Sequence, residues 1–528
     1  MKQVRVNRRQ VCLLALGAAA SGRVLAQSGP GPDADALHVL NRLAYGPLAG
    51  DVGRVMQIGV DAYIAEQLHP ENIAMPQALL RQLDALDTTR LSQRELIVQF
   101  REAQQAAKNE TEDGKAQRRE LYQRLTLQAG EARLLRALQS PAQLQEVMVD
   151  FWFNHFNVFI GKGLDRVLVE NYERVAIRPY ALGRFRDLLG ATAHHPAMLF
   201  YLDNWQSVVA GYQAPRAAGA LAKTSGLNEN YARELMELHT LGVDGGYSQT
   251  DVTELARMLT GWTFNPRLRG GESIFYFDPQ RHDNGDKQWL GRHVRGRGQV
   301  EGEEALDVLA AHPATARRIG YAITQYFVQD EPPPALVERL SRRFLDTGGD
   351  IRAVLKTLFD SAEFRAPRVS GAKFKTPYRY LLSAVRASGI AVTNVRPLLA
   401  TAYQLGMPLY GCQTPDGYKN TEDAWLNPDA ITRRVNFATA FASGRLPFAR
   451  PMEMVDPGGI GKAALKRPVD TPANTPFNPA WATEPVNAAA VLGLLGSSIS
   501  ARTREAVAQA EPGLRAALVL GSPDFMRH

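Results

Sequence analysis

Apolar residues recur at helical spacing in one segment after another, and this repetition restricts the chain to a largely helical fold. In residues 34–45, Leu37, Leu40 and Ala44 share one helical face, and the Gly-Pro pair that follows ends the helix. The same spacing predicts further helices over 51–67, 76–86, 92–107, 117–139, 141–159 and 487–528. Strand-like alternation is scarce, and its best candidates, 273–277 and 288–290, predict one small β-hairpin. The sequence therefore predicts a mainly α fold, a multi-helix globular body with long loops.

Three segments interrupt the helical pattern. Residues 108–120 are charged and contain Gly114, which predicts a solvated turn between two long helices. Residues 266–303 are rich in Gly, Arg and charge and predict a long loop, which in a compact domain is often functional. Residues 446–485 are rich in Pro and Gly and predict a surface segment without regular structure.

The first 26 residues have the three parts of a signal peptide. A basic stretch precedes a short apolar run over 11–20, and Val24-Leu25-Ala26 offers a small-residue cleavage site. The adjacent Arg8 and Arg9 favour twin-arginine export, with an ordinary secretory leader as the alternative. We therefore expect residues 27–528 to form the mature protein, in the periplasm or outside the cell. Twin-arginine export carries folded cargo, so a metal or cofactor loaded in the cytoplasm is compatible with it.

Removing this segment changes what the composition implies. The whole chain carries a net charge of +7, but residues 1–26 hold five basic side chains and no acidic ones. The remainder is close to neutral, so the high overall basicity does not indicate nucleic-acid binding. Of the two cysteines only Cys412 lies outside the signal, which excludes an intramolecular disulfide in the mature chain. No later segment supplies 18 uninterrupted apolar residues, so no membrane span is expected after signal removal.

The segment 226–242 holds the densest group of residues suited to chemistry. As a continuous helix it places Asn230, Glu234, Glu237 and Leu241 on one stripe at the edge of the core. Two carboxylates one turn apart can share a cation, or take different pKa values and act as acid and base. His239 does not complete the His-Glu-x-x-His zinc spacing, so any metal role for it with the two carboxylates needs another geometry.

A purely structural interpretation of the same segment stands beside the functional one. Arg233 and Glu237 are four residues apart, and on a helix they would form an ordinary ion pair. The remaining polar groups would then belong to a buried network.

A second polar group lies within an almost wholly aromatic helix over 150–157. Asp150, Asn154 and Asn157 share one helical face, with His155 at its edge. Such a helix is buried, and its polar side chains need partners, which the Glu234 segment could supply. A single histidine among aromatic residues is more often a satisfied core residue than a ligand.

The third group lies on a loop over 277–287. His282, Asp283 and Lys287 stand beside Gly285, where loop residues can form a site or simply close a turn.

These groups coincide with the motifs that link the chain to a known family. The sequence resembles the bacterial DUF 1800 family over nearly all of its mature length. The matching stretches are 40–42, 45–47, 151–156, 195–199, 201–204, 228–242, 247–248, 251–252, 256–257, 259–262, 282–283, 287 and 373–377. The resemblance implies an exported helical protein, often encoded beside DUF 1501 proteins of the sulfatase type. It implies no reaction.

We weigh three hypotheses for function. The first is a periplasmic hydrolase acting on an envelope or extracellular polymer, such as a glycan or its esters. Its catalytic residues would be Glu234, Glu237, His155, His282 and Asp283. Its substrate contacts would come from Asn154, Asn230, Arg233, Lys287 and Trp262, and a divalent metal would use His239 with Glu234 and Glu237. The second is a redox protein that holds a metal or haem. The third is a non-enzymatic partner or escort of a DUF 1501-like protein.

Overall fold

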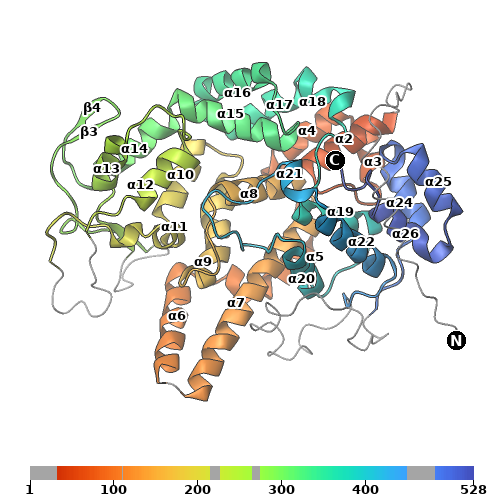
Figure 1. Ribbon diagram of the computed structural model, residues 1–528, viewed down its shortest axis with the longest axis horizontal. Coiled ribbons are helices and arrows are strands. Elements are labelled where there is room, and N and C mark those ends of the chain that lie inside the picture. Colours follow the sequence, from red (N-terminus) through yellow and green to blue (C-terminus); the bar gives the residue numbers. More distant parts are fainter. Residues whose placement is uncertain (1–31, 110, 214–225, 265–273, 449–481) are drawn as a thin grey trace.

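The computed structural model describes residues 32–109, 111–213, 226–264, 274–448 and 482–528. These residues form 24 α-helices and two small antiparallel sheets in one globular body (Figure 1). The prediction of a mainly α fold is therefore confirmed. The predicted signal peptide lies outside the described residues, as does 449–481, most of the predicted Pro- and Gly-rich segment. No described helix combines the length and hydropathy that a membrane crossing requires.

The N-terminal helices follow the predicted spacing, with one break. Helix α2 (Pro32–Leu43) precedes α3 (Asp51–Ile58) and α4 (Val60–Gln67). The pattern over 51–67 predicts a single helix, but Gly59 takes φ 85°, a left-handed conformation that interrupts it. Helix α5 (Gln77–Asp84) follows as expected.

Helices α6 (Gln93–Lys108) and α7 (Glu112–Gln139) form a long hairpin that projects from the body (Figure 1). The predicted turn between two long helices exists but is shorter than 108–120, because α6 ends at Lys108 and α7 begins directly after its N-cap Thr111. Gly114 belongs to the first turn of α7, where an added Cβ would stand 2.1 Å from the carbonyl oxygen of Ala106. This glycine permits a close approach of two helices, and it does not break one.

The most aromatic segment forms α8 (Gln143–His155), which packs against α2, α4 and α7. Trp152 is fully buried there, stacks near Phe156 and donates its indole N–H to the carbonyl of Ala181 at 2.9 Å. The helices that follow are α9 (Asp165–Tyr172), the π-helical segment η3 (Glu173–Ile177), α10 (Phe185–His194) and α11 (Pro196–Tyr201).

A buried ion network fixes α7 to α8 and η3. The Arg133 guanidinium lies 2.5 Å from Asp150 and 3.1 Å from Glu173, and the hydroxyl of Tyr410 donates to Glu173 at 2.9 Å. Asp150 therefore has its partner on α7.

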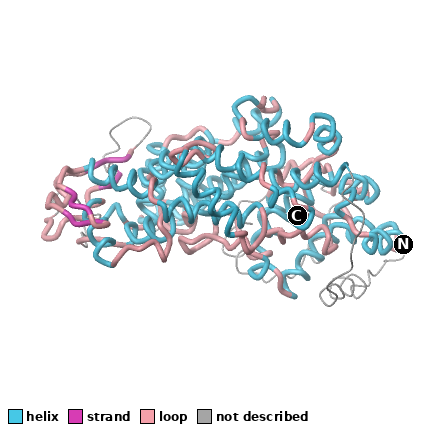
Figure 2. Tube along the Cα trace, turned by 90° about the horizontal axis from the view of Figure 1, so that it is seen from above, coloured by secondary structure: helices cyan, strands magenta, loops and turns pink. Residues whose placement is uncertain are grey.

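Two hairpins lie at one end of the molecule (Figure 2). Strand β1 (Trp262–Phe264) pairs with β2 (Phe275–Phe277), and β3 (Lys287–Trp289) pairs with β4 (Arg292–Val294). Both predicted strands exist, but each pairs with a neighbour that the alternation did not indicate. The predicted loop 266–303 thus carries three short strands in its described part.

The remaining helices complete the body and return the chain to its centre. They are α13 (Gln249–Met258), α14 (Gln299–Ala310), α15 (Pro313–Phe327), α16 (Pro334–Asp346), α17 (Ile351–Phe359), α18 (Ala362–Arg365), α19 (Pro377–Ser388), α20 (Arg396–Gln404), α21 (Glu422–Trp425), α22 (Pro428–Ala442), α24 (Ala488–Leu495), α25 (Ala501–Gln509) and α26 (Pro512–Leu520). An antiparallel bridge between Phe374 and Arg527 holds the last residues against the start of α19.

Candidate functional site

The segment with the two paired carboxylates is only partly α-helical. Helix α12 (Asn230–Glu234) passes directly into a π-helical segment, η7 (Leu235–His239). The wider π turn breaks the predicted stripe, because Leu241 lies beyond the helix and is buried while Asn230 is exposed. Glu234 and Glu237 both remain half-buried. Single π turns occur frequently at functional sites, and this one lies in the segment that holds both carboxylates.

Side chains from other elements bind the carbonyl oxygens at the end of η7. The guanidinium of Arg318, on α15, donates to the carbonyl of Leu238 at 2.9 Å. The imidazole Nε2 of His155, on α8, lies 3.0 Å from the carbonyl oxygen of His239. The predicted contact between the aromatic helix and the Glu234 segment is therefore real, although it joins an imidazole to the backbone and does not reach a carboxylate.

Both histidines at this contact are held neutral. Burial lowers the pKa of His155 to about 3, and the nearby Arg318 lowers it further while the bond to His239 opposes the shift. Burial also lowers the pKa of His239, which is 1% exposed and whose Nε2 has no hydrogen-bond partner among the described residues. Both rings are therefore neutral near neutral pH, and His155 supports the π turn through its bond to the carbonyl of His239. The catalytic role of His155 and the metal role of His239 stay predictions, since a neutral imidazole is the form that binds a metal.

The surroundings of Glu234 favour the protonated form of its carboxyl group. Its pKa is raised by burial first, and then by the negative charges of Glu237 and Asp416, against the opposing charge of Arg233. Arg233 itself pairs with Glu229 at 3.2 Å, so the ion pair with Glu237 that helical spacing predicts does not form.

Asp416 is a site residue that the sequence analysis missed. Burial tends to raise its pKa, but hydrogen bonds from Thr414 and Lys419 outweigh this and lower it. Asp416 is therefore ionised under conditions in which Glu234 tends to be protonated. Its Thr-Pro-Asp-Gly context is a turn pattern, and nothing in the local sequence indicates that the turn approaches Glu234.

Asparagines of the aromatic segment bring that turn to the site. Asn154 binds the backbone of Tyr418 twice, accepting from its N–H at 2.8 Å and donating to its carbonyl at 2.9 Å. Asn157 donates to the carbonyls of Cys412 and Thr414 at 3.1 and 2.8 Å. The amide of Asn154 is thereby occupied, so the predicted substrate contact becomes a clamp for the loop 410–418.

Tyr201, at the end of α11, contacts the same loop. Its hydroxyl donates to the carbonyl of Gln413 at 2.9 Å. Burial raises the pKa of Tyr201, and the charges of Cys412, Asp165 and Glu234 raise it further. The site thus draws on α8, α11, the π segment and the loop 410–418.

The third predicted group forms a separate buried network. His282 lies 2.6 Å from one oxygen of Glu301, and Lys287 lies 2.7 Å from the other, with all three side chains 0% exposed. Asp283 is paired with Arg257 at 2.8 Å. No hydrogen bond or ion pair among the described residues links this network to Glu234 or Glu237. The predicted catalytic roles of His282 and Asp283 and the substrate role of Lys287 are therefore unsupported, because these groups satisfy one another inside the fold.

Two further predicted substrate contacts, Trp262 and Asn230, have partners within the fold. Trp262 is fully buried, and Gly302 lies so close that an added Cβ would stand 2.5 Å from the indole. Asn230 is exposed, and its amide donates to the carbonyl of Leu202 at 3.3 Å.

The carboxylates do not form a metal centre with His239 in this arrangement. Within the part of the chain that the structure describes, no three His, Cys, Asp or Glu side chains are grouped to hold a metal ion. The tentative assignment of Glu234, Glu237 and His239 as ligands thus lacks the geometry that it needs.

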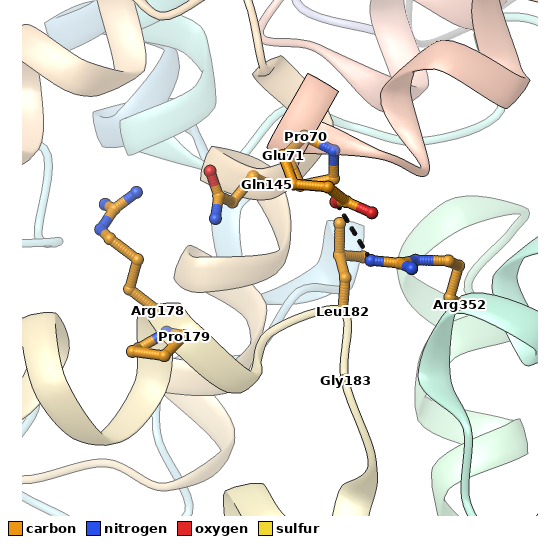
Figure 3. A pocket seen from close by; sticks show the side chains of 8 residues that line it. All are labelled: Pro70, Glu71, Gln145, Arg178, Pro179, Leu182, Gly183 and Arg352. Atoms are coloured by element: carbon orange, nitrogen blue, oxygen red, sulfur yellow. Dashed lines mark hydrogen bonds and ion pairs between the residues drawn. The ribbon is translucent and has the colours of Figure 1, made fainter. Parts of the chain in front are cut away.

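A cavity of about 260 Å³ lies elsewhere, between α8 and α17 (Figure 3). Its arginines already have partners, because Arg352 pairs with Glu71 at 3.2 Å and Arg178 binds both oxygens of Glu146 at 2.7 and 2.9 Å. None of the predicted site residues lines it.

The fold and the site define a mainly helical protein with two carboxyl groups at a π turn. A family model described as "Protein of unknown function (DUF1800)" matches residues 38–527, nearly the whole chain. The chain belongs to the DUF1800 family, as its motifs indicate. No curated protein and no solved structure matches it.

Proposed function

We propose that this protein is an exported hydrolase that acts on a glycan or glycan ester, with Glu234 as its general acid. One observation carries the proposal: two neighbouring carboxyl groups, Glu234 and Asp416, have pKa values shifted in opposite directions. Environments that separate the pKa values of paired carboxyl groups are how enzymes divide acid and base roles between them.

The proposed roles follow from the charge states. Protonated Glu234 donates its proton to the leaving-group oxygen, and ionised Asp416 activates water or stabilises positive charge on the sugar. After burial, the negative charge of Glu237 is the second cause that raises the pKa of Glu234. Because Glu234 is half-buried and Asp416 is exposed, the pair is open to the surface, as a polymeric substrate requires.

The proposed compartment agrees with such a substrate. We place the protein in the periplasm or outside the cell, exported by the twin-arginine route through residues 1–26. This part of the proposal rests on Arg8-Arg9, the apolar run and the small-residue cleavage site.

Glu237→Gln is expected to shift the pH dependence of activity without abolishing it. A general acid works only when protonated, so activity falls at high pH as Glu234 loses its proton. Removing the neighbouring charge makes that loss easier and moves the alkaline limb of the kcat/KM profile to lower pH. The profile is measured on whichever of a panel of envelope polysaccharides and acylated glycans the wild type cleaves.

Asp244→Asn provides the matched control, since it removes an exposed negative charge from the turn after the π segment. It is expected to leave the profile in place. A wild type that cleaves nothing in the panel and co-purifies with a sulfatase-like partner would transfer the function to that partner. An unshifted profile for Glu237→Gln would remove Glu237 from the mechanism.

A further inference from the structure

Buried cations lie close to His528, at the end of the chain that is marked C in Figure 1. Their residues are each 4% exposed or less and come from α2, the segment before α19, α19 and α22. They are Arg42, Lys373, Lys375, Arg379 and Arg434, here called the cation cluster.

The cation cluster has few acidic partners. Asp330 pairs with Lys373 and is partly exposed. Asp150, which is linked to Arg379 through the hydroxyl of Tyr326, is already bound by Arg133. The cluster therefore holds more positive charge than the acidic groups around it neutralise.

Backbone carbonyls satisfy only part of the cluster's donors. Arg42 donates one Nη to the carbonyls of Val328 and Val369, at 3.3 and 2.5 Å, and Arg434 donates one Nη to Lys375 at 2.7 Å. The Nε and the second Nη of Arg42, and the second Nη of Arg434, are buried without a hydrogen-bond partner among the described residues. The Arg434 guanidinium lies over the rings of Phe374 and Tyr380, which offer no hydrogen-bond acceptor of ordinary strength. Unpaired buried donors on charged groups are costly, so the site as it stands lacks an acceptor.

The electrostatics of neighbouring groups agree with this excess. Burial lowers the pKa of Lys375, and the positive charges of Arg379 and Arg434 lower it further. Burial and four cations of the cluster also lower the pKa of His528. Its ring therefore stays neutral and adds no further positive charge to the cluster.

We propose that the cation cluster is a binding site for an oxyanion, a carboxylate, phosphate or sulfate group. The anion is a free one that the fold encloses, beside the backbone pairing of His528 with Lys373 through bonds of 2.9 and 3.2 Å. The inference is independent of the proposed hydrolase site.

Lys375→Met tests the proposal by the sign of its effect on the melting temperature. If an oxyanion is bound, the variant loses part of its site and melts below the wild type. If the cations face one another without an anion, removing one relieves repulsion, and the variant melts above the wild type. Arg434→Met is expected to act in the same direction, so agreement of the two variants excludes a local packing effect.

The melting temperature in phosphate tests for the free anion. A free anion predicts a saturable rise in the melting temperature of the wild type in phosphate, relative to chloride at equal ionic strength, that Lys375→Met abolishes. Lys356→Met, on the surface of α17, reports the general effect of phosphate on any folded protein. A higher melting temperature for Lys375→Met, without phosphate dependence in any variant, overturns the proposal.

Discussion

Glu234→Gln is expected to reduce kcat/KM by about 10²- to 10⁴-fold, the range typical for loss of a general acid, without changing the melting temperature. Glutamine keeps the shape of the side chain but has no proton to donate. The carboxyl group is half-buried and forms no hydrogen bond or ion pair among the described residues, so its amide should not disturb the fold. Steady-state kinetics and thermal melting of the same preparation measure both quantities.

Glu229→Gln is the matched control, because Glu229 precedes the same helix and pairs with Arg233 near the surface. We expect its kcat/KM to stay within a few-fold of the wild type. Equal losses in both variants would point to a general effect on the segment and contradict a specific role for Glu234. An unfolded Glu234→Gln protein would make the carboxyl group structural.

Glu301→Gln is expected to lower the free energy of unfolding by about 3–5 kcal/mol, the usual cost of breaking a buried charge pair. Glu301 is the carboxylate that both His282 and Lys287 face at 2.6 and 2.7 Å. Without its charge, Lys287 would remain buried with only the carbonyl of Asp283 as a partner. Denaturant unfolding followed by circular dichroism gives the difference.

Glu304→Gln, on the exposed side of the same helix, is the matched control, because it removes the same charge from an exposed ion pair. Its partner Arg297 is half exposed, so the loss should not exceed about 1 kcal/mol. Similar small losses for both glutamates would show that the His282 network does not hold the loop. A Glu301→Gln protein that keeps its stability but loses activity would restore the catalytic interpretation of His282.

The fold could be predicted in large part because helix formation leaves a local record. The spacing of apolar residues locates α2, α5 and α6 closely. The helix prediction fails at two glycines whose structural role differs from the one that the local sequence indicates. Gly59 divides a predicted helix, and Gly114 stands inside α7 where a turn is expected. Strand pairing was also missed, since β1 and β4 are three residues long and show no alternation.

The candidate site could be predicted only in part, because its geometry depends on contacts between distant segments. Glu234 and Glu237 stand out by their spacing in the sequence. The π turn does not stand out in the sequence, because the side chains that bind its carbonyl groups come from the distant helices α8 and α15. Asp416 is about 180 residues from Glu234 along the chain, and only the clamping of its loop by Asn154 and Asn157 relates them. The sequence likewise does not show that His282 pairs with Glu301, because Glu301 lies on a later helix.

The most direct test of the central claim needs no substrate: the carboxyl titration of Glu234, followed by NMR in protein with ¹³C-labelled glutamate. Glu234→Gln assigns the signal by its disappearance, and Glu237→Gln reports the influence of the neighbour. The account predicts a carboxyl group whose pKa lies above the ordinary range of glutamate and falls when Glu237 is neutralised. A Glu234 that titrates in the ordinary range in both proteins would contradict its role as the general acid.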